Sequence, residues 1–361
     1  MKILVAGDWH SELHEEAVYQ AFIKLGHEVL KFGWHDYFTP KNRADVIYKK
    51  IQNRFIIGPI VRRLNQELIK AAAQFAPDMV FVYRGTHITG ATLKAIKKQH
   101  QEVTLVGYNN DDPFAKGHPY SLWRHFFKAV PEYDLMLAYR HHNIEDFLRL
   151  GARRVELLRS WYSPERNHPV ILSDDDRVKY ECDVVFVGHY ESDGRKKYLE
   201  ELVRQGFKVR LFGPGYDWDP VLRNSTELKS LIPVRLVWGE EYNKALCGAK
   251  VAICFLSKLN RDTYTRRCFE IPATGTLMLS EHTDDLASLY IAGAEADFFR
   301  TKEELIEKLK LYVGDETLRR SVAANGYRRV MAEGHDVVSR MKQVLAWVAE
   351  INFRRKGSNS V

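Results

Sequence analysis

Short apolar runs of strand length alternate with amphipathic stretches of helical character along most of the chain. In the first half these runs are residues 3–6, 28–32, 79–82, 103–106, 135–138 and 155–158. In the second half they are residues 183–187, 208–212, 234–237, 251–255, 276–279 and 296–299. Strands that alternate with helices are typical of a parallel, doubly wound sheet covered by helices on both faces. The pattern therefore predicts an α/β fold with two similar domains in series.

The alternation breaks between Ser163 and Tyr180, where Pro164, Pro169 and an acidic run at residues 174–176 interrupt it. Prolines and clustered polar residues are typical of loops, so this stretch is the predicted linker. A chain of 361 residues also exceeds what one hydrophobic core usually holds. We expect an N-terminal domain over residues 1–165, a linker over 166–180 and a C-terminal domain over 181–335.

Apolar residues at helical spacing predict amphipathic helices near the end of the chain. The residues that carry the pattern are Leu305, Leu309, Tyr312, Val322, Tyr327, Val330, Val337, Met341, Val344 and Val348. We expect the last of these helices to cover residues 336–353. Residues 353–361 are expected to form a frayed tail.

The composition is that of a globular protein, with 45% hydrophobic and 28% charged residues. No apolar run reaches the roughly 20 residues that a membrane-spanning helix needs. The first residues lack the longer core and cleavage site of a signal peptide, so we expect a cytoplasmic protein. Without a Cys-x-x-Cys pair, the cysteines are expected to be buried thiols in a reducing compartment. They are Cys182, Cys247, Cys254 and Cys268.

The charge balance is basic, with a net charge of +7, which favours anionic partners without choosing among them. Residues 41–70 hold eight lysines and arginines against Asp45 and Glu67, around an apolar run at residues 55–61. Basic amphipathic helices can lie on anionic membranes, so peripheral contact with the inner face of a membrane is one interpretation. A helical hairpin broken at Gly58-Pro59, with its charges facing water, is the simpler one.

Polar turns follow several of the predicted strands, and ligands of open parallel sheets bind beyond the carboxyl ends of strands. In the N-terminal domain these turns are residues 7–10, 84–87 and 108–113. In the C-terminal domain, Gly188 with Arg195 and Lys196 follows the first strand, and Gly213 follows the next. Glycines in such turns let backbone N–H groups approach phosphate oxygens, and the following helix N-terminus adds partial positive charge. The second domain is therefore the better candidate for binding a phosphorylated ligand.

The segment from Thr263 to Glu281, TYTRRCFEIPATGTLMLSE, places two arginines and Glu270 on a short predicted helix before an apolar strand. Arg266 and Glu270 are one helical turn apart, so they can meet a ligand together or form a simple ion pair. The segment resembles the donor-binding motif of CgeB-like glycosyltransferases, a branch related to the GT-B group 1 (family 4-like) enzymes. The resemblance covers most of the chain, but its specific part is this segment.

The resemblance implies a GT-B fold, with two Rossmann-like domains facing an interdomain cleft and a C-terminal helix that crosses back to the N-terminal domain. In that family the carboxylate matching Glu270 accepts hydrogen bonds from the ribose diol, for which a charged acceptor is suited. Asp262 stands where the relatives carry a glutamate that contacts the sugar. The further nucleotide-sugar ligands expected are Gly188, Arg195, Lys196, Gly213, Trp238, Gly239, Thr265 and Arg266. For Trp238, core packing at a strand end is the alternative.

Glycosyl transfer also needs the leaving nucleotide diphosphate to be stabilised, which positioned cations and helix N-termini can do without a metal. We therefore expect no metal and no other cofactor, although aspartates cluster at residues 174–176 and 217–219. A general base is expected among Asp112, Asp111, Asp8 and His10. Asp112 is favoured because CgeB-like proteins show a similar acidic turn, whereas a purely structural turn is the alternative.

Together these features predict a metal-independent glycosyltransferase that moves a hexosyl or related group from a nucleotide diphosphate sugar. The acceptor, a glycan, peptide or small molecule, is not identified by the sequence. A nucleotide-sugar epimerase or a phosphorylase of the same fold is an alternative. A noncatalytic nucleic-acid or glycan-binding protein is another, but no RNA-binding motif is present and no nucleic-acid partner is expected.

Overall fold

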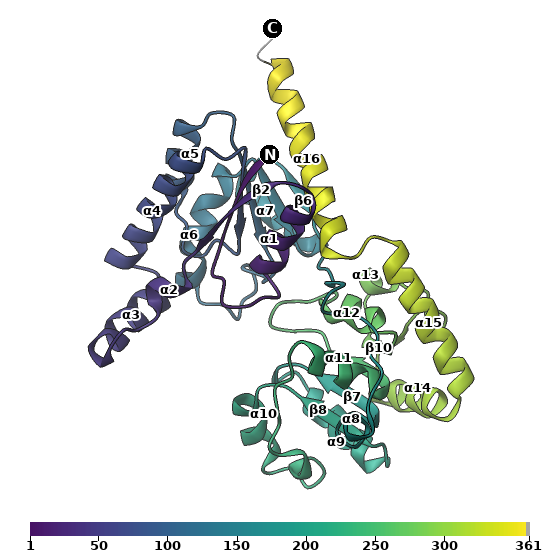
Figure 1. Ribbon diagram of the computed structural model, residues 1–361. Helices are drawn as coiled ribbons and strands as arrows, with labels where there is room; N and C mark the ends of the chain where they lie inside the picture. Colours follow the sequence, from purple (N-terminus) through teal and green to yellow (C-terminus); the bar gives the residue numbers. More distant parts are fainter. Residues whose placement is uncertain (359–361) are drawn as a thin grey trace. The chain divides into compact units, whose positions relative to one another are not determined.

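The computed structural model describes residues 1–358, which form two compact units (Figure 1). Unit 1 comprises Met1–Ser160 together with the chain from Val337 onward, and unit 2 comprises Trp161–Asp336. Each unit has its own parallel sheet and its own apolar core. The two α/β domains expected from the alternating pattern are therefore present.

Unit 1 contains a six-stranded sheet in the order β2-β1-β3-β4-β5-β6. Its strands are β1 (Lys2–Gly7), β2 (Glu28–Gly33), β3 (Met79–Tyr83), β4 (Thr104–Asn109), β5 (Leu135–Ala138) and β6 (Val155–Leu157). Its helices are α1 (Glu15–Lys24), α2 (His35–Phe38), α3 (Arg43–Phe55), α4 (Pro59–Phe75), α5 (Gly90–Gln99), α6 (Tyr120–Ala129), α7 (His141–Arg149) and α16 (Val337–Ser358), with a 3-10 turn η1 (Val130–Glu132). All paired strands are parallel, and β1 lies inside the sheet, with Val5 between Lys31 and Phe81.

Helix α16 belongs to unit 1, where it packs against α1 and β4 (Figure 1). Its apolar residues at helical spacing are buried, namely Val337, Met341, Val344 and Val348. The Thr104 hydroxyl donates to Asn352 Oδ1 at 2.8 Å, and Arg355 forms an ion pair with Asp134. These contacts keep residues 353–358 helical instead of frayed, and residues 359–361 lie outside the described residues.

Unit 2 contains a five-stranded parallel sheet in the order β11-β10-β9-β7-β8. Its strands are β7 (Cys182–Val187), β8 (Val209–Phe212), β9 (Ala249–Cys254), β10 (Leu277–Glu281) and β11 (Asp297–Phe299). Its helices are α8 (Asp174–Tyr180), α9 (Arg195–Arg204), α10 (Gly215–Leu222), α11 (Glu240–Cys247), α12 (Arg267–Ala273), α13 (Asp284–Ala287), α14 (Lys302–Gly314) and α15 (Glu316–Ala332), with a 3-10 turn η2 (Lys229–Leu231).

The segment at residues 234–237, expected to be a strand, forms only a single bridge between Arg235 and Phe212 at the edge of β8. Pro233 has no N–H to donate to a ladder, which limits pairing at the start of the segment. Leu236 and Trp238 are 47% and 53% exposed, so this edge segment faces water with alternate side chains. The strand prediction for this segment was wrong.

The acidic run at residues 174–176, expected to lie in the linker, forms the first turn of α8. The Ser173 side chain accepts from the Asp176 backbone N–H, and the Asp176 carboxylate accepts from the Ser173 backbone N–H. This capping box satisfies two N–H groups at the helix start, and acidic side chains there are favoured by the helix dipole. Unit 2 accordingly begins before α8, at Trp161.

Three further expectations concern the hairpin, the cysteines and the length of helices. Helices α3 and α4 form the hairpin broken at Gly58-Pro59. The cysteines are free thiols; Cys182, Cys254 and Cys268 are buried, and Cys247 is partly exposed. Among residues 1–358, no helix has the length and apolar content needed to traverse a bilayer.

The first five strands of the unit 1 sheet have the same order as the five strands of the unit 2 sheet. In each, the first strand lies between the second and the third, so the order changes direction between β1 and β3 and again between β7 and β9. At such a switch point the neighbouring connections leave on opposite sides of the sheet and open a crevice at the carboxyl ends of the strands. These two positions are where ligand-binding side chains are to be sought.

Candidate functional site

Arg267 spans the switch point of unit 2. Its Nη1 donates to the Val187 carbonyl at the end of β7 at 3.3 Å, and its Nη2 donates to the Phe255 carbonyl just after β9 at 3.4 Å. A Cβ added to Gly188 would lie 2.7 Å from Nη1, so the glycine leaves room for the guanidinium group. The side chain is half-buried, and its planar fork suits carboxylate or phosphate oxygens. The first residue of α12 thus presents a cation where this fold binds ligands.

Glu270 lies one turn further along α12 and is 6% exposed. Its Oε2 accepts a hydrogen bond of 2.7 Å from the Tyr242 hydroxyl on α11. Burial, with the Glu270 charge adding to it, raises the pKa of Tyr242 well above its usual value. The phenol therefore remains protonated and donates to the carboxylate. A nearly buried carboxylate oriented in this way is suited to accept hydrogen bonds from hydroxyl groups.

Gly213 brings the turns after β7 and β8 into direct contact. A Cβ at this position would lie 2.2 Å from the Gly188 carbonyl oxygen, which excludes any other residue without a backbone shift. The Trp218 Nε1 donates to the same carbonyl at 2.8 Å. Close backbone packing therefore accounts for a glycine at position 213. Its expected role as a ligand-binding residue stays a prediction.

Trp238 and Gly239 form the entry to α11. Trp238 is 53% exposed and therefore lies outside the core, which argues against the core-packing interpretation. Gly239 has a φ of +55° and a ψ of −126°, a combination that side chains with a Cβ strongly disfavour. The indole is consequently presented to solvent beside the N-terminus of a helix whose second residue, Glu241, is engaged by Lys179 and Tyr180.

Arg195 and Lys196, the cations expected to meet a diphosphate, are both held in ion pairs. Arg195 is only 3% exposed; its Nη2 lies 2.5 Å from an Asp193 oxygen, and its Nη1 donates to the His189 carbonyl at 2.7 Å. Lys196 Nζ lies 3.3 Å from Glu200 on the next turn of α9. These contacts fold the turn after β7 against itself, so its charge is largely neutralised within the turn.

Asp262, Thr265 and Arg266 all precede α12. The Asp262 N–H donates to the Ser257 carbonyl at 2.8 Å, and Thr265 Oγ1 accepts from the Arg267 N–H at 3.2 Å. Arg266 is the N-cap residue, and its carbonyl accepts from the Glu270 N–H at 3.1 Å. The helix begins at Arg267, whose side chain lies at the switch point, whereas the sequence favours Arg266 as a ligand; that expectation stays a prediction.

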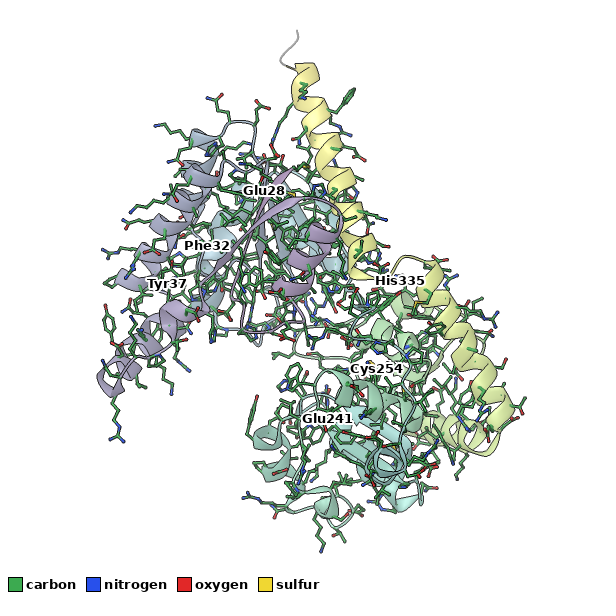
Figure 2. All side chains as sticks on the ribbon, viewed as in Figure 1. Glu28, Phe32, Tyr37, Glu241, Cys254 and His335 are labelled. Carbon is green, nitrogen blue, oxygen red and sulfur yellow. The ribbon has the colours of Figure 1, made fainter. Side chains whose placement is uncertain are left out.

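Two buried thiols, Cys254 and Cys268, lie next to each other beside Arg267. Cys254 is labelled in Figure 2. Cys254 Sγ at the end of β9 lies 3.8 Å from Cys268 Sγ on α12. The hydrogen bond with Cys268 lowers the pKa of Cys254 to about 6, burial opposes this, and the Arg267 charge adds to it. Burial of Arg267 lowers the pKa of its guanidinium, and a negative charge on Cys254 would raise it.

The switch point of unit 1 carries a carboxylate surrounded by histidines. His10 Nδ1 lies 2.8 Å from Asp8 Oδ2, and His35 Nδ1 lies 3.8 Å from Asp8 Oδ1. The His10 side chain is 45% exposed, and its Nδ1 is the ring nitrogen that faces Asp8. Trp9 and Arg84, which lie in the turns after β1 and β3, have φ values of +61° and +63°. Strained backbone of this kind in non-glycine residues concentrates at functional sites.

Electrostatics couple these groups. The hydrogen bond that His10 donates to Asp8 raises the pKa of His10, with burial opposing it. Burial would raise the pKa of Asp8, but the hydrogen bond with His10 and the neighbouring histidines lower it overall. Burial lowers the pKa of His87 to about 4, so that residue stays neutral. His10 and Asp8 therefore form an imidazole–carboxylate pair, in which the carboxylate orients the ring and stabilises its protonated form.

Asp111 and Asp112, the other expected bases, follow β4. Asp111 Oδ2 lies 2.9 Å from Arg84 Nη2. Asp112 is fully buried; its Oδ1 accepts from Asn143 Nδ2 at 3.0 Å and from the Phe114 N–H at 3.1 Å, and its Oδ2 lies 3.3 Å from His142 Nε2. Both oxygens are engaged inside unit 1. This geometry suits the structural role for Asp112 better than a role as base.

The aspartates at residues 217 and 219, the remaining cluster, form contacts within unit 2. Asp217 Oδ2 lies 2.8 Å from His189 Nδ1, and Asp219 Oδ1 accepts from the Val234 N–H at 2.9 Å. Within residues 1–358 no group of three or more histidine, cysteine, aspartate or glutamate side chains is arranged to hold a metal ion.

A family model described as glycosyl transferase-like matches residues 195–346, which include Arg267 and Glu270. No curated protein sequence is matched. HepE from Anabaena, solved in complex with UDP-glucose, superposes with a TM-score of 0.68 at 13% identity, covering 97% of this chain and 100% of that one. Sucrose-phosphate synthase from Thermosynechococcus elongatus gives 0.67 at 13%, with 97% and 99% covered. A glycosyltransferase from Rickettsia africae gives 0.65 at 10%, with 97% and 98% covered.

The chain therefore has the GT-B glycosyltransferase fold, with two Rossmann-like parallel-sheet domains and a C-terminal helix. The fold expected from the motif around Glu270 is confirmed.

Proposed function

We propose that this protein is a glycosyltransferase that uses a nucleotide diphosphate sugar as donor. The observation that carries the proposal is the placement of Arg267 and Glu270, a cation and a nearly buried carboxylate three residues apart, at the switch point of unit 2. A nucleoside diphosphate carries both groups that this pair recognises, a diol and a diphosphate. The complex of the Anabaena relative with UDP-glucose is consistent with such a donor. Within the glycosyltransferases, the segment from Thr263 to Glu281 favours the CgeB-like branch.

In this proposal Glu270 accepts hydrogen bonds from the ribose diol, and Tyr242 holds its carboxylate in place. Arg267 binds the diphosphate and stabilises the negative charge that develops as the sugar leaves. The N-terminus of α11 lies beside Trp238, whose exposed ring is available for stacking on a base. Because a fixed guanidinium supplies the charge, transfer is proposed to proceed without a metal, and activity should be insensitive to EDTA.

For the acceptor we propose that His10 is the general base. Its Nδ1 is bonded to Asp8, which leaves Nε2 to take a proton from an acceptor hydroxyl within hydrogen-bond reach. The proton moves from the hydroxyl to Nε2, the oxygen forms the new bond to the anomeric carbon, and the bond from that carbon to the diphosphate breaks. Asp8 stabilises the imidazolium that results, as carboxylates do in other imidazole–carboxylate pairs.

The test is a panel of nucleotide sugars incubated with the protein, with release of nucleoside diphosphate measured with and without candidate acceptors. Acceptor-stimulated release from one donor supports the proposal. Interconversion of two nucleotide sugars without an acceptor would instead identify an epimerase. Failure of every nucleoside diphosphate to bind at micromolar concentration in isothermal titration would contradict the proposal.

A further inference from the structure

The apolar side of helix α3 faces water. Its outward stripe consists of Ile47, Ile51 and Phe55, which are 69%, 48% and 44% exposed, and Tyr48 beside them is 50% exposed. These positions fall within about 100° of arc on a helix that turns 100° per residue. A helix on the surface of a water-soluble domain normally turns its apolar stripe to the core. In Figure 1, α3 extends from the α2 and α4 side of unit 1.

The inward side of α3 is polar and is fixed to unit 1 by hydrogen bonds. Gln52 is 5% exposed, and its Oε1 accepts from the Ile60 N–H at 2.9 Å. Lys49 Nζ donates to the Thr39 carbonyl at 2.8 Å, and Asn53 Oδ1 lies 3.0 Å from His87 Nε2. The helix is therefore held in register by polar contacts, and its apolar stripe is left for another surface.

Basic residues border the apolar stripe on one side. Arg43, Lys50 and Arg54 are exposed and project next to one another, since their spacing of seven and four residues returns to nearly the same angle. Beyond the C-terminal end of α3 lies a groove of about 490 Å³, whose lining includes Ile57, Val61, Ile69 and Arg62. Residues 41–70 as a whole carry eight basic side chains against two acidic ones.

We infer that α3, with the adjoining edge of α4, is a docking surface for an anionic membrane. Apolar side chains would enter the boundary between headgroups and acyl chains, while Arg43, Lys50 and Arg54 would meet lipid phosphates; a helix with this division of residues lies in the plane of the interface. The commitment to a lipid surface rests on charge complementarity. A second copy of this chain would bring the same cluster of cations against itself, and each cation near an anionic surface is attracted whereas paired cations repel.

The surface also bears on the acceptor. Asn53 of α3 contacts His87, which lies on the turn after β3, at the switch point that holds Asp8 and His10. Docking through α3 would bring that end of the unit 1 sheet to the bilayer surface. If the proposed function holds, the acceptor is then a molecule presented at a membrane.

The test is sedimentation of the full chain with vesicles of phosphatidylcholine alone and with vesicles containing roughly one-third phosphatidylglycerol. Binding is expected only to the anionic vesicles and should weaken as salt is raised, because screening shortens to about 8 Å at physiological ionic strength. The triple variant Arg43→Gln, Lys50→Gln, Arg54→Gln should bind at least about tenfold more weakly. The triple variant Ile47→Ser, Ile51→Ser, Phe55→Ser should also lose about tenfold or more, because it removes the apolar insertion.

Matched controls remove the same chemistry elsewhere. Lys98→Gln, Lys310→Gln and Lys342→Gln together delete three exposed charges, and Ile171→Ser deletes a side chain that is 96% exposed. Neither control should change vesicle binding by more than about twofold. Vesicle binding should also slow amide exchange in residues 43–55, a readout that does not depend on the variants folding.

Three outcomes would overturn the inference. The first is absence of binding to anionic vesicles at low salt. The second is binding that neither triple variant weakens. The third is concentration-dependent self-association in light scattering that the Ile47, Ile51 and Phe55 variant abolishes, which would assign the surface to a second copy of the chain. Because none of these residues belongs to the proposed donor or base groups, sugar transfer to a soluble acceptor should be unchanged, which separates this test from that of the proposed function.

Discussion

In the proposed complex, Glu270 binds the ribose of the donor and Arg267 binds its diphosphate. The two contributions can be measured separately. Glu270→Gln should weaken binding of both a nucleoside and its diphosphate by about tenfold or more, because a hydrogen bond to a charged acceptor contributes about 1.5–3 kcal/mol. Arg267→Met should weaken the diphosphate by a similar factor and leave the nucleoside nearly unchanged. Isothermal titration with both ligands measures the two effects.

The matched control for Arg267→Met is Arg266→Met, which removes the same charge from the neighbouring residue. A larger loss of diphosphate binding in the Arg266 variant would assign the diphosphate to Arg266, the residue that the sequence favours. Tyr242→Phe should weaken binding less than Glu270→Gln does, because it removes the positioning hydrogen bond and keeps the carboxylate. An equal loss of nucleoside binding in the Arg267 variant would contradict the division.

The His10 and Asp8 pair predicts a pH dependence. Only neutral His10 can accept a proton, and the hydrogen bond with Asp8 raises its pKa, so kcat/KM should rise with pH through that raised pKa. Asp8→Asn removes the charge that raises the pKa, so the rise should move to lower pH while the plateau falls. The measurement is the pH profile of initial rates for the two proteins at subsaturating donor.

His10→Gln should lower turnover by about a hundredfold or more and leave donor affinity unchanged. His168→Gln, an exposed histidine in unit 2, is the control and should leave both unchanged. Normal turnover in the His10 variant would remove it from the reaction and would fit a mechanism in which no side chain takes the acceptor proton.

At the scale of single residues, the sequence predicts the segment that holds the proposed donor-binding groups but not which of its side chains lie at the switch point. The choice between Arg266 and Arg267 depends on the local turn before α12, where the Thr265 hydroxyl accepts from the Arg267 N–H. The neutralisation of Arg195 depends on Asp193, whose carboxylate accepts from the Arg195 side chain two residues later in the same turn. Asp112, in the loop after β4, accepts a hydrogen bond from Asn143 of α7, which is distant in sequence. Such contacts arise only when the chain is folded.

At the scale of elements, the turns after β7 and β8 are packed so closely that adding one methyl group should lower the stability of unit 2. Gly213→Ala places a Cβ 2.2 Å from the Gly188 carbonyl oxygen, which is rigid backbone. Overpacking of this kind costs about 1–3 kcal/mol, so the midpoint of unfolding of unit 2 in urea should fall. Gly293→Ala is a poor control because its φ of +72° adds strain, whereas Gly314→Ala meets open space and should be nearly neutral.

The variant Gly188→Ala should affect diphosphate binding more than the stability of unit 2. The atom its Cβ would approach most closely is Arg267 Nη1, at 2.7 Å, the far end of a flexible side chain. The variant should therefore retain stability better than Gly213→Ala while it displaces the guanidinium and weakens diphosphate binding. A larger loss of stability in Gly188→Ala than in Gly213→Ala would contradict this assignment of the two glycines.

Most strands were predictable because apolar runs in parallel sheets are buried on both faces, as β3 shows from Met79 to Tyr83. The exception at residues 234–237 has the same apolar character but lies beside an edge strand after Pro233, so composition alone could not distinguish it. Helix α8 was missed because aspartates that indicate a loop also start helices when a serine precedes them.

At the scale of the whole molecule, unit 1 depends on a helix that is distant from it in sequence. Met341 of α16 is fully buried, and Met341→Ala should cost unit 1 about 2–5 kcal/mol, the range for deleting a buried side chain of this size. Amide exchange should accelerate in α1 and β4, which α16 contacts, and remain unchanged in unit 2. Lys342→Ala, an exposed neighbour, is the control. Uniform acceleration across both units would show that they do not unfold separately.

The same discontinuity sets an order of events during synthesis. Residues 1–160 leave the ribosome first, but the apolar face that α16 covers stays open until the chain beyond residue 337 has emerged. Unit 2, which is continuous in sequence, can close while unit 1 is still waiting for its last helix. A nascent chain of this protein therefore completes its second domain before its first, and a stalled ribosome would expose the N-terminal domain, not the C-terminal one, to chaperones and proteases.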